Sequence, residues 1–225
     1  GVRGDRLYQI TDGLQITVEN RTGELDRAHQ TQTVLNSLMR LSLENLSLND
    51  ILTQALDVIL VFPWLSIEPA GGIFLADNNS KKLKLIASRS MSPELSTLCV
   101  NVPYGYCICG RAASSQKIEF ADCFDERHDV NYEGMQPHSH YCVPIIDEGT
   151  TLGVFVLYTE TDHKEDIRIV NFLEAVASIL ASTIIRKNDE QQLNSSAQRY
   201  QDLFDNVSDL IYTHDLEGRF LTLNH

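Results

Sequence analysis

Apolar positions follow a helical repeat along the N-terminal part of the chain. Two series run at intervals of seven residues and interleave. The first series is Leu7, Leu14, Arg21, Ala28 and Leu35, and the second is Thr11, Val18, Leu25, Gln32 and Met39. Interleaved heptad series are typical of a coiled-coil seam, so we expect residues 1–41 to form a helix that pairs with a second copy. A single amphipathic helix packed on its own domain is the alternative.

A second helix and a β-hairpin are predicted next. Residues 47–50 can cap a helix, and the apolar positions that follow form one helical stripe that ends before Pro63. These positions are Ile51, Leu52, Ala55, Leu56, Ile59 and Leu60. Two apolar runs, 71–76 and 83–88, are separated by Asp77 to Ser80, which have turn chemistry. This pattern predicts two antiparallel strands.

The second half of the chain repeats the strand pattern and then returns to a helical one. Residues 138–146 and 152–159 are β-rich runs around a turn at Gly149, and residues 166–187 have helical apolar spacing. We therefore predict an α+β fold, an antiparallel sheet flanked by helices. Polar residues 188–201 can extend the last helix, and 210–214 with 219–223 predict a third hairpin.

Charge and composition exclude several partners. The formal net charge is −13 and the pI is about 4.8, so nucleic acid is not an expected partner. The apolar stretches 51–67 and 175–185 are interrupted or short, and no secretory leader precedes them. Five cysteines, an odd number, fit a reducing compartment. We expect a cytoplasmic location, and we expect any attachment to a membrane to come only from a segment outside this sequence.

Residues 42–187 resemble a GAF domain, a sensory module that binds small molecules. The resemblance rests on five features in order: the apolar first helix, the strand Gly71–Leu75, the helix start Gly110–Ala113, the segment Asp122–Arg127, and Val143–Ile145 followed by Leu152–Val154. It implies a GAF-like antiparallel sheet with long signalling helices at both ends.

The flanking segments resemble other parts of bacterial sensor proteins. Residues 200–207, followed by Asp209–Ile211 and Asp215–Arg219, look like the start of a PAS domain, and Val18–Leu25 is similar to a signalling helix. We thus expect residues 188–199 to be a helical linker and 200–225 a truncated PAS start. The resemblance implies downstream PAS and effector domains of a histidine kinase or diguanylate cyclase. The heptad spacing predicts a homodimer that acts on them, and because no catalytic motif is evident in the sequence we expect no catalytic centre in this chain.

A set of cysteine and histidine residues is the sharpest candidate for chemistry. In extended chain, Cys107 and Cys109 would point to one side, as would His138, His140 and Cys142. Thiolate and imidazole are ligands of iron and zinc, so we predict a transition metal or an iron-containing cofactor held by these five residues. Cys109 precedes a helix expected to start at Gly110, where the helix dipole would lower its thiol pKa.

Other readings of these residues stay open. The thiols could form a redox switch, the cluster could be inert core, or the ligand could be another small molecule. Tyr106, Cys123 and His128 are weaker candidates for ligand binding. The free-methionine-sulfoxide reductases are GAF enzymes that use cysteines, but the spacing of cysteines here does not resemble theirs.

Overall fold

The computed structural model describes most of the chain as two compact units. Backbone structure is described for residues 2–61, 67–122, 125–132, 134–135, 138–161, 163–206 and 212–223, and side chains for these except 2–14, 16–17, 67–68, 205 and 223. The first unit comprises residues 1–183 and the second residues 184–225. Each unit is described by itself.

A six-stranded antiparallel sheet forms the centre of the first unit. Its strand order is β3-β2-β1-β6-β5-β4, so the two hairpins β1–β2 and β5–β6 join through β1 and β6. The strands are β1 Ile67–Asp77, β2 Lys82–Arg89, β3 Asn101–Pro103, β4 Glu119–Ala121, β5 Ser139–Asp147 and β6 Thr150–Thr159. Both predicted hairpins and the α+β fold class are confirmed. The short strands β3 and β4 were not predicted.

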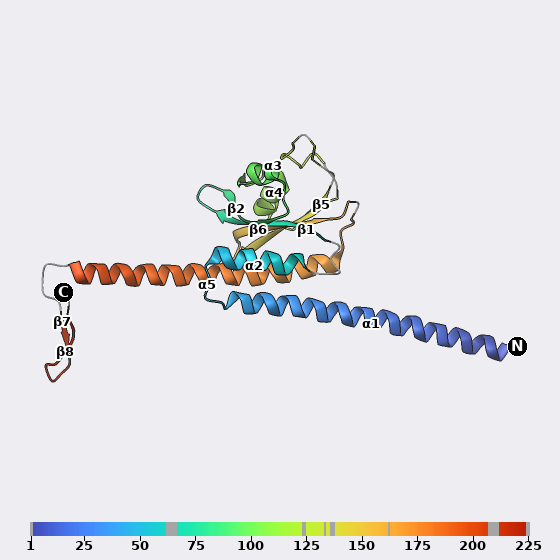
Figure 1. Ribbon diagram of the computed structural model, residues 1–225, viewed down its shortest axis with the longest axis horizontal. Coiled ribbons are helices and arrows are strands. Elements are labelled where there is room, and N and C mark those ends of the chain that lie inside the picture. The colour runs from blue at the N-terminus through green and yellow to red at the C-terminus, as the bar shows by residue number, and fades with distance from the viewer. Residues whose placement is uncertain are drawn as a thin grey trace. The chain divides into compact units, whose positions relative to one another are not determined.

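Helices cover both faces of this sheet (Figure 1). On one face lie α2, Leu48–Leu60, and the first part of α5, Ile167–Asn206. On the other face lie two short helices, α3, Pro93–Leu98, and α4, Cys107–Ser115. The α4 face, with its short helices and long loops, holds most of the cysteine and histidine residues of interest.

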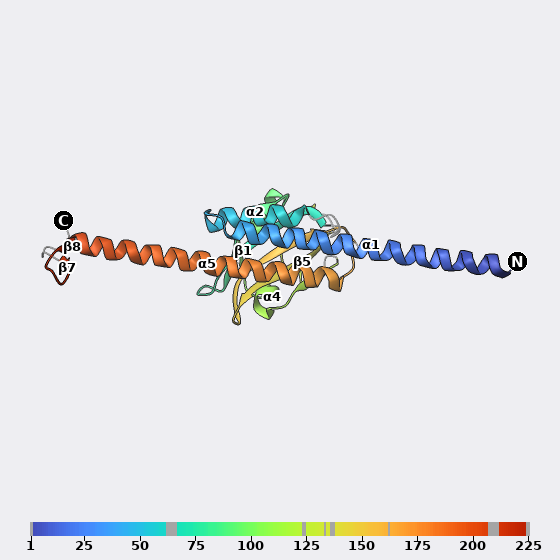
Figure 2. The same cartoon turned by 90° about the horizontal axis from the view of Figure 1, so that it is seen from below.

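The N-terminal helix α1, Val2–Ser42, lies outside the layer formed by α2 and α5 (Figure 2). Its C-terminal end is anchored by Leu38 and Leu41, which are buried. Three members of its second heptad series, Val18, Leu25 and Met39, are instead at least half exposed. A helix is therefore confirmed for this segment, while its pairing with a second copy stays a prediction.

Local capping explains where the elements begin. The Asp50 N–H donates to the Ser47 hydroxyl at the start of α2, and the N–H groups of Asn79 and Ser80 donate to the Asp77 carboxylate in the β1–β2 turn. These are the interactions that serine and aspartate supply at helix starts and turns. Helix α3 has the same signal, because Ser92 accepts the Leu95 N–H, yet the sequence analysis missed it.

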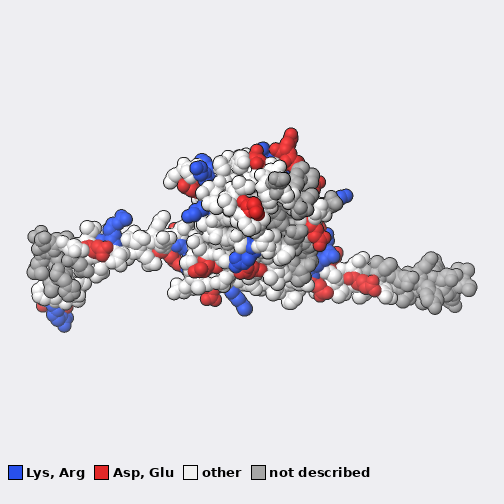
Figure 3. All heavy atoms as spheres, turned by 45° about the horizontal axis from the view of Figure 1, so that its top comes forward, with Lys and Arg blue, Asp and Glu red and all other residues white. Residues whose placement is uncertain are grey.

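Charged side chains are interspersed over the face of the first unit that Figure 3 shows. One ion pair links two layers: the Arg89 guanidinium donates to both carboxylate oxygens of Asp57, at 2.6 and 2.9 Å, and joins β2 to α2. A bidentate pair of this kind fixes orientation as well as position.

Helix α5 runs through the polar residues 188–201, which were expected to extend it, and continues from the first unit into the second. It has the length and composition of a membrane-spanning helix, with a mean hydropathy of 1.6 in its most apolar window, but half of that window is buried in the protein. Packing against the sheet, through residues such as Phe172, Leu173 and Val176, accounts for these apolar positions.

The second unit holds the end of α5 and a two-stranded hairpin. Strands β7, Tyr212–His214, and β8, Phe220–Leu223, pair antiparallel, and Asp215 accepts the N–H groups of Glu217 and Arg219 in the turn. The predicted third hairpin is confirmed. Its assignment to a PAS domain stays a prediction.

Candidate functional site

Strand β5 presents two of the predicted ligands on the face that α4 covers. His140 and Cys142 alternate with Tyr141, as a strand with a two-residue side-chain period requires. Cys142 packs in one apolar cluster with Ile108 and Ala112 of α4. His140 therefore lies on the α4 side of the sheet, opposite Tyr158 of β6.

Three imidazole rings meet at the N-terminal end of β5. The ring centroids of His128 and His140 are 4.8 Å apart, those of His138 and His140 are 5.3 Å apart, and those of His128 and His138 are 5.6 Å apart. One ring nitrogen from each residue lies within 4.8 Å of the other two. This spacing brings three nitrogen ligands of the type that zinc and iron use around one point.

An arginine-centred turn that follows β4 positions His128. The Arg127 guanidinium donates to Asp125, at 2.6 Å, and to the Phe120 carbonyl of β4, at 3.0 Å. The His128 N–H donates to the Asp125 carbonyl. These bonds tie the loop that carries His128 to the sheet edge beside β5.

Burial keeps two of these imidazoles neutral. His140 is only 4% exposed, and burial together with the neighbouring His138 and His128 lowers its pKa well below the usual value. The pKa of His128 is lowered too, first by burial and then by His138. Neutral imidazole is the form that binds a metal. In addition, Nδ1 of His140 is buried and has no hydrogen-bond partner among the described residues, an arrangement that proteins usually avoid.

The cysteines form a second group, next to the histidines. Cys109 Sγ of α4 lies 3.2 Å from Cys142 Sγ of β5. Cys99 and Cys107 pack against the same apolar cluster. Burial raises the pKa of Cys107 and Cys142, and raises that of Cys99 to about 12. These thiols are therefore protonated at neutral pH.

The segment with Cys107 and Cys109 is helical, which corrects the prediction of extended chain. Helix α4 begins at Cys107, three residues earlier than expected, so the two thiols do not share a face as they would in a strand. At the helix start itself, burial raises the pKa of the Cys107 thiol and outweighs the favourable backbone hydrogen bonds, while the low thiol pKa predicted for Cys109 stays a prediction. Desolvation raises a thiol pKa and can outweigh the lowering effect of backbone N–H groups at a helix terminus.

Asp129, in the loop that carries His128, caps α4. Tyr106, at the N-cap, makes no side-chain cap, and the Cys107 N–H instead donates to the carboxylate of Asp129, at 2.6 Å. The Tyr106 hydroxyl donates to the Asp129 carbonyl. Cys107 has a positive φ of 53°, which is unfavourable for a residue with a side chain. Asp129, adjacent to His128, thus holds a strained helix start in place.

Tyr158 lies between the two groups. Its ring centroid is 4.9 Å from that of His138 and 5.6 Å from that of His140, and its ring packs against the cluster that contains Cys142. The structure thus places the five predicted metal ligands on one side of the sheet, in two neighbouring groups rather than around one point. The histidine group gains His128, which the sequence analysis gave only a minor role.

A cavity of about 240 Å³ opens beside the histidines, between the sheet and α3. His138 and Tyr158 line it, together with residues from the start of α3 and from the loop that follows His128. The other lining residues include Met91, Ser92, Leu95, Tyr132 and Met135. The cavity gives a small ligand access to the imidazole group.

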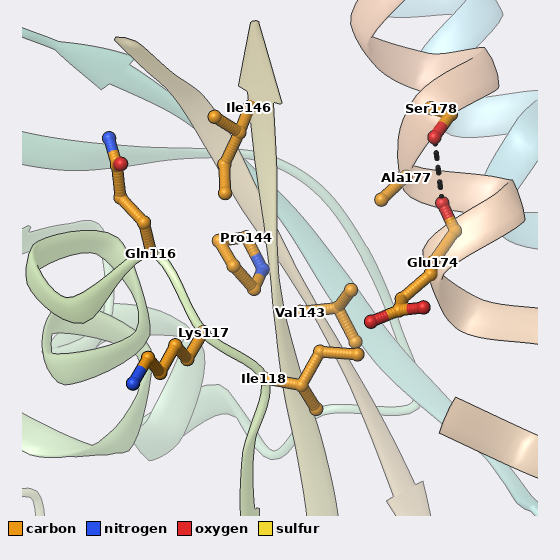
Figure 4. Close-up of a pocket in the computed structure, with 9 residues that line it drawn as sticks. All are labelled: Gln116, Lys117, Ile118, Val143, Pro144, Ile146, Glu174, Ala177 and Ser178. Carbon is orange, nitrogen blue, oxygen red and sulfur yellow. Dashed lines mark hydrogen bonds between the residues drawn. The ribbon is translucent and has the colours of Figure 1, made fainter. Parts of the chain in front are cut away.

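A second cavity, of about 300 Å³, lies away from this chemistry (Figure 4). It is bounded by the segment Gln116–Ile118, by Val143, Pro144 and Ile146 of β5, and by one turn of α5 around Glu174. Its lining combines apolar side chains with Lys117 and Glu174 and contains no histidine or cysteine.

Four residues in and around the site illustrate the limits of sequence reasoning. Tyr106 supports the Asp129 loop through its hydroxyl, and Cys123 lies outside the described residues. Tyr158 was not predicted at all, although its register opposite His140 follows once the hairpin β5–β6 is known. Asp129 was not singled out by the sequence analysis, and no local pattern reveals that it caps a helix 22 residues earlier.

We expect Gly110→Ala to destabilise the site and the fold. A Cβ atom at Gly110 would lie 2.2 Å from the Pro103 carbonyl oxygen, which is backbone and cannot swing aside. Helix α4 would have to move away from β3, with a loss of about 2 kcal/mol in the free energy of unfolding. Urea denaturation measures this loss. Ser114→Ala, on the exposed side of the same helix, is the control and should change stability little.

The described architecture is that of a small α+β domain with a central antiparallel sheet and a cavity on one face. The chain belongs to the GAF domain family, because a sequence model of the GAF domain matches residues 45–185. No curated protein matches the chain.

Solved structures share this fold. The GAF domain of an Acinetobacter phosphoenolpyruvate-protein phosphotransferase is 18% identical, with a TM-score of 0.59 over 72% of this chain and 97% of its own. The GAF domain of a Coxiella burnetii phosphoenolpyruvate-protein phosphotransferase is 16% identical, with a TM-score of 0.63 over 73% and 98%. The free methionine-R-sulfoxide reductase of Neisseria meningitidis is 18% identical, with a TM-score of 0.60 over 71% and 91%. At these identities the likeness concerns the fold alone.

Proposed function

We propose that this chain is the sensory input module of a bacterial signal-transduction protein and that its GAF domain binds a divalent transition metal ion through His128, His138 and His140. The observation that supports the proposal is the convergence of three imidazole nitrogens within 4.8 Å, one of them from the buried His140. Three protein ligands leave further coordination positions open. A small molecule that enters through the 240 Å³ cavity can occupy such a position.

The chemistry of the group favours a borderline metal such as zinc or iron. Neutral imidazole is a ligand for both ions, and the lowered pKa values of His128 and His140 mean that little proton release accompanies binding near neutral pH. Nδ1 of His140 is buried and has no protein partner among the described residues, and an ion bound through this nitrogen would satisfy it. A buried polar atom of this kind is costly unless something binds it.

Two structural connections support a relay from the site. Tyr141 follows His140 on β5 and points to the opposite face, where its hydroxyl accepts the N–H of Asp166 just before α5 begins. Asp129 follows His128 and caps α4. A metal that draws His128 and His140 together would therefore act on the starts of two helices. We propose that α5 carries this change toward downstream PAS and effector domains.

The same proposal includes a homodimer in the cytoplasm, formed through the terminal helices. Val18, Leu25 and Met39 are exposed at seven-residue multiples along α1, and Leu193 and Tyr200 are exposed seven residues apart in α5. Exposed apolar residues at heptad spacing are the requirement of a coiled-coil seam. We propose a regulatory rather than an enzymatic role, in keeping with the sensory function typical of GAF domains.

Titration of the metal-free protein tests metal binding. We expect Zn²⁺ and Co²⁺ to bind at one ion per chain in calorimetry, with a visible Co²⁺ spectrum that Zn²⁺ abolishes. The double variant His128→Ala/His138→Ala should lose this binding, and His29→Ala, at an exposed position of α1, should keep it. Equal binding by the double variant would contradict the proposal.

A further inference from the structure

Two thiols meet where α4 crosses β5, outside the histidine group. Cys109 lies in the first turn of α4 and Cys142 in the middle of β5, and their Sγ atoms are 3.2 Å apart. A disulfide has an S–S distance of about 2.05 Å, so the two sulfur atoms need to approach by only about 1 Å. Helix α4 and strand β5 are separated by 33 positions in sequence at these residues, so a bond between them would close a long loop.

We propose that Cys109 and Cys142 form a reversible disulfide, closed by an oxidant of the peroxide class, that ties α4 to β5. The pair is a modification site separate from metal binding, because it involves none of the three imidazoles. Cys109 is only partly buried, whereas Cys142 is buried among Ile108, Ala112 and Val156. An oxidant from solvent therefore reaches Cys109 first.

The chemistry balances in two steps. A peroxide ROOH transfers one oxygen atom to the Cys109 thiol, which becomes a sulfenic acid, and leaves as the alcohol ROH, or as water when the oxidant is hydrogen peroxide. The Cys142 thiol then attacks the sulfenic sulfur. The S–S bond forms, the S–O bond breaks, and one water molecule leaves with the Cys142 proton. A dithiol reductant reverses the bond by thiol–disulfide exchange.

The position of the bond suggests what it would control. Cys142 is two residues from His140 on the same face of β5, and Cys109 is two residues from Cys107, whose N–H is held by Asp129. The disulfide would fix the first turn of α4 against the sheet beside Tyr158, which packs against the same cluster. It would thus lock one wall of the site in a single position.

Thiol counting and mass spectrometry test the proposal. The protein is kept metal-free with a chelator, treated with hydrogen peroxide, denatured and alkylated. We expect the number of free thiols to fall from five to three, with a peptide pair joined through Cys109 and Cys142, and a return to the starting number after dithiothreitol. His128→Ala/His138→Ala should behave in the same way, so that failure of metal binding and failure of this proposal are distinguishable.

Matched cysteine variants identify the bond. Cys109→Ser should retain all of its remaining thiols after the same treatment. Cys142→Ala should lose only the Cys109 thiol, as sulfenic acid, and form no cross-link within the chain. Cys99→Ser, from the same cluster, should still lose two thiols to the cross-link. Cys109 is only partly buried, so Cys109→Ser should fold. This variant keeps the test valid even if Cys142→Ala does not fold. Cross-linked peptides that join other cysteines or two chains, or an unchanged thiol count, would overturn the proposal.

Discussion

His138→Ala is expected to weaken binding of Zn²⁺ or Co²⁺ by at least about 100-fold. The loss of a residue that merely supports a metal ligand typically costs about 10- to 100-fold in affinity, and His138 would be a ligand itself. Its side chain is only partly buried, so its removal should leave the fold intact. His128→Ala should have a similar effect. Competition with a chromophoric chelator gives the affinities.

Cysteine variants decide between the site seen in the structure and the one predicted from sequence. The structure separates the Cys109–Cys142 pair from the three imidazoles, so Cys109→Ser should change metal affinity by less than about tenfold, the lower end of the effect of a neighbouring group. The sequence alone predicted one site with five ligands. If Cys109→Ser lost as much metal affinity as His138→Ala, the result would favour the predicted site with five cysteine and histidine ligands and contradict the three-histidine assignment. His29→Ala controls for nonspecific binding.

The histidine part of the site could be predicted because it depends on a regular element. A β-strand has a two-residue side-chain period, and the apolar run that ends at Ile146 identified β5, so a common face for His140 and Cys142 followed directly. The same regularity explains why both hairpins and the α5 start were predicted correctly. Period and turn chemistry are local properties of the sequence.

The remainder of the site depends on contacts that no local pattern contains. The prediction of extended chain at Cys107 and Cys109 failed because the cap of α4 comes from Asp129, far along the chain, and the segment itself offers no serine or aspartate at the N-cap. His128 is placed by Arg127, through its bond to the Phe120 carbonyl. Whether β5 and α4 bring their thiols together is likewise a matter of tertiary packing.

Acid is expected to destabilise the metal-free protein between pH 6.5 and pH 5, largely through His140. In the unfolded chain this imidazole has a pKa of about 6.5. In the folded protein its pKa is well below that value, first because of burial and then because of His138, His128 and Arg127, which Asp125 opposes only in part. Below pH 6.5 the unfolded state therefore binds a proton that the folded state does not, and the free energy of unfolding falls as the pH falls.

The size of this effect follows from the same linkage. The slope approaches about 1.4 kcal/mol per pH unit, so His140 should account for a loss of about 2 kcal/mol at pH 5. The lowered pKa of His128 acts in the same direction. Asp125 affects stability in a lower pH range, because its pKa is lowered from 3.8 and its contribution to the free energy of unfolding is lost only in stronger acid. Above pH 6.5, the contribution of His140 to the free energy of unfolding should not change with pH.

Urea denaturation at a series of pH values, with a chelator present, measures the slope, and His140→Phe should reduce it. Phenylalanine keeps an aromatic ring in the buried position and has no proton to take up. His140→Gln serves if the phenylalanine variant does not fold, and His29→Phe should keep the full slope. An unchanged slope in both His140 variants would show that this imidazole titrates normally. The low pKa that weakens the metal-free fold in acid is also what keeps His140 neutral, and therefore able to bind a metal, at neutral pH.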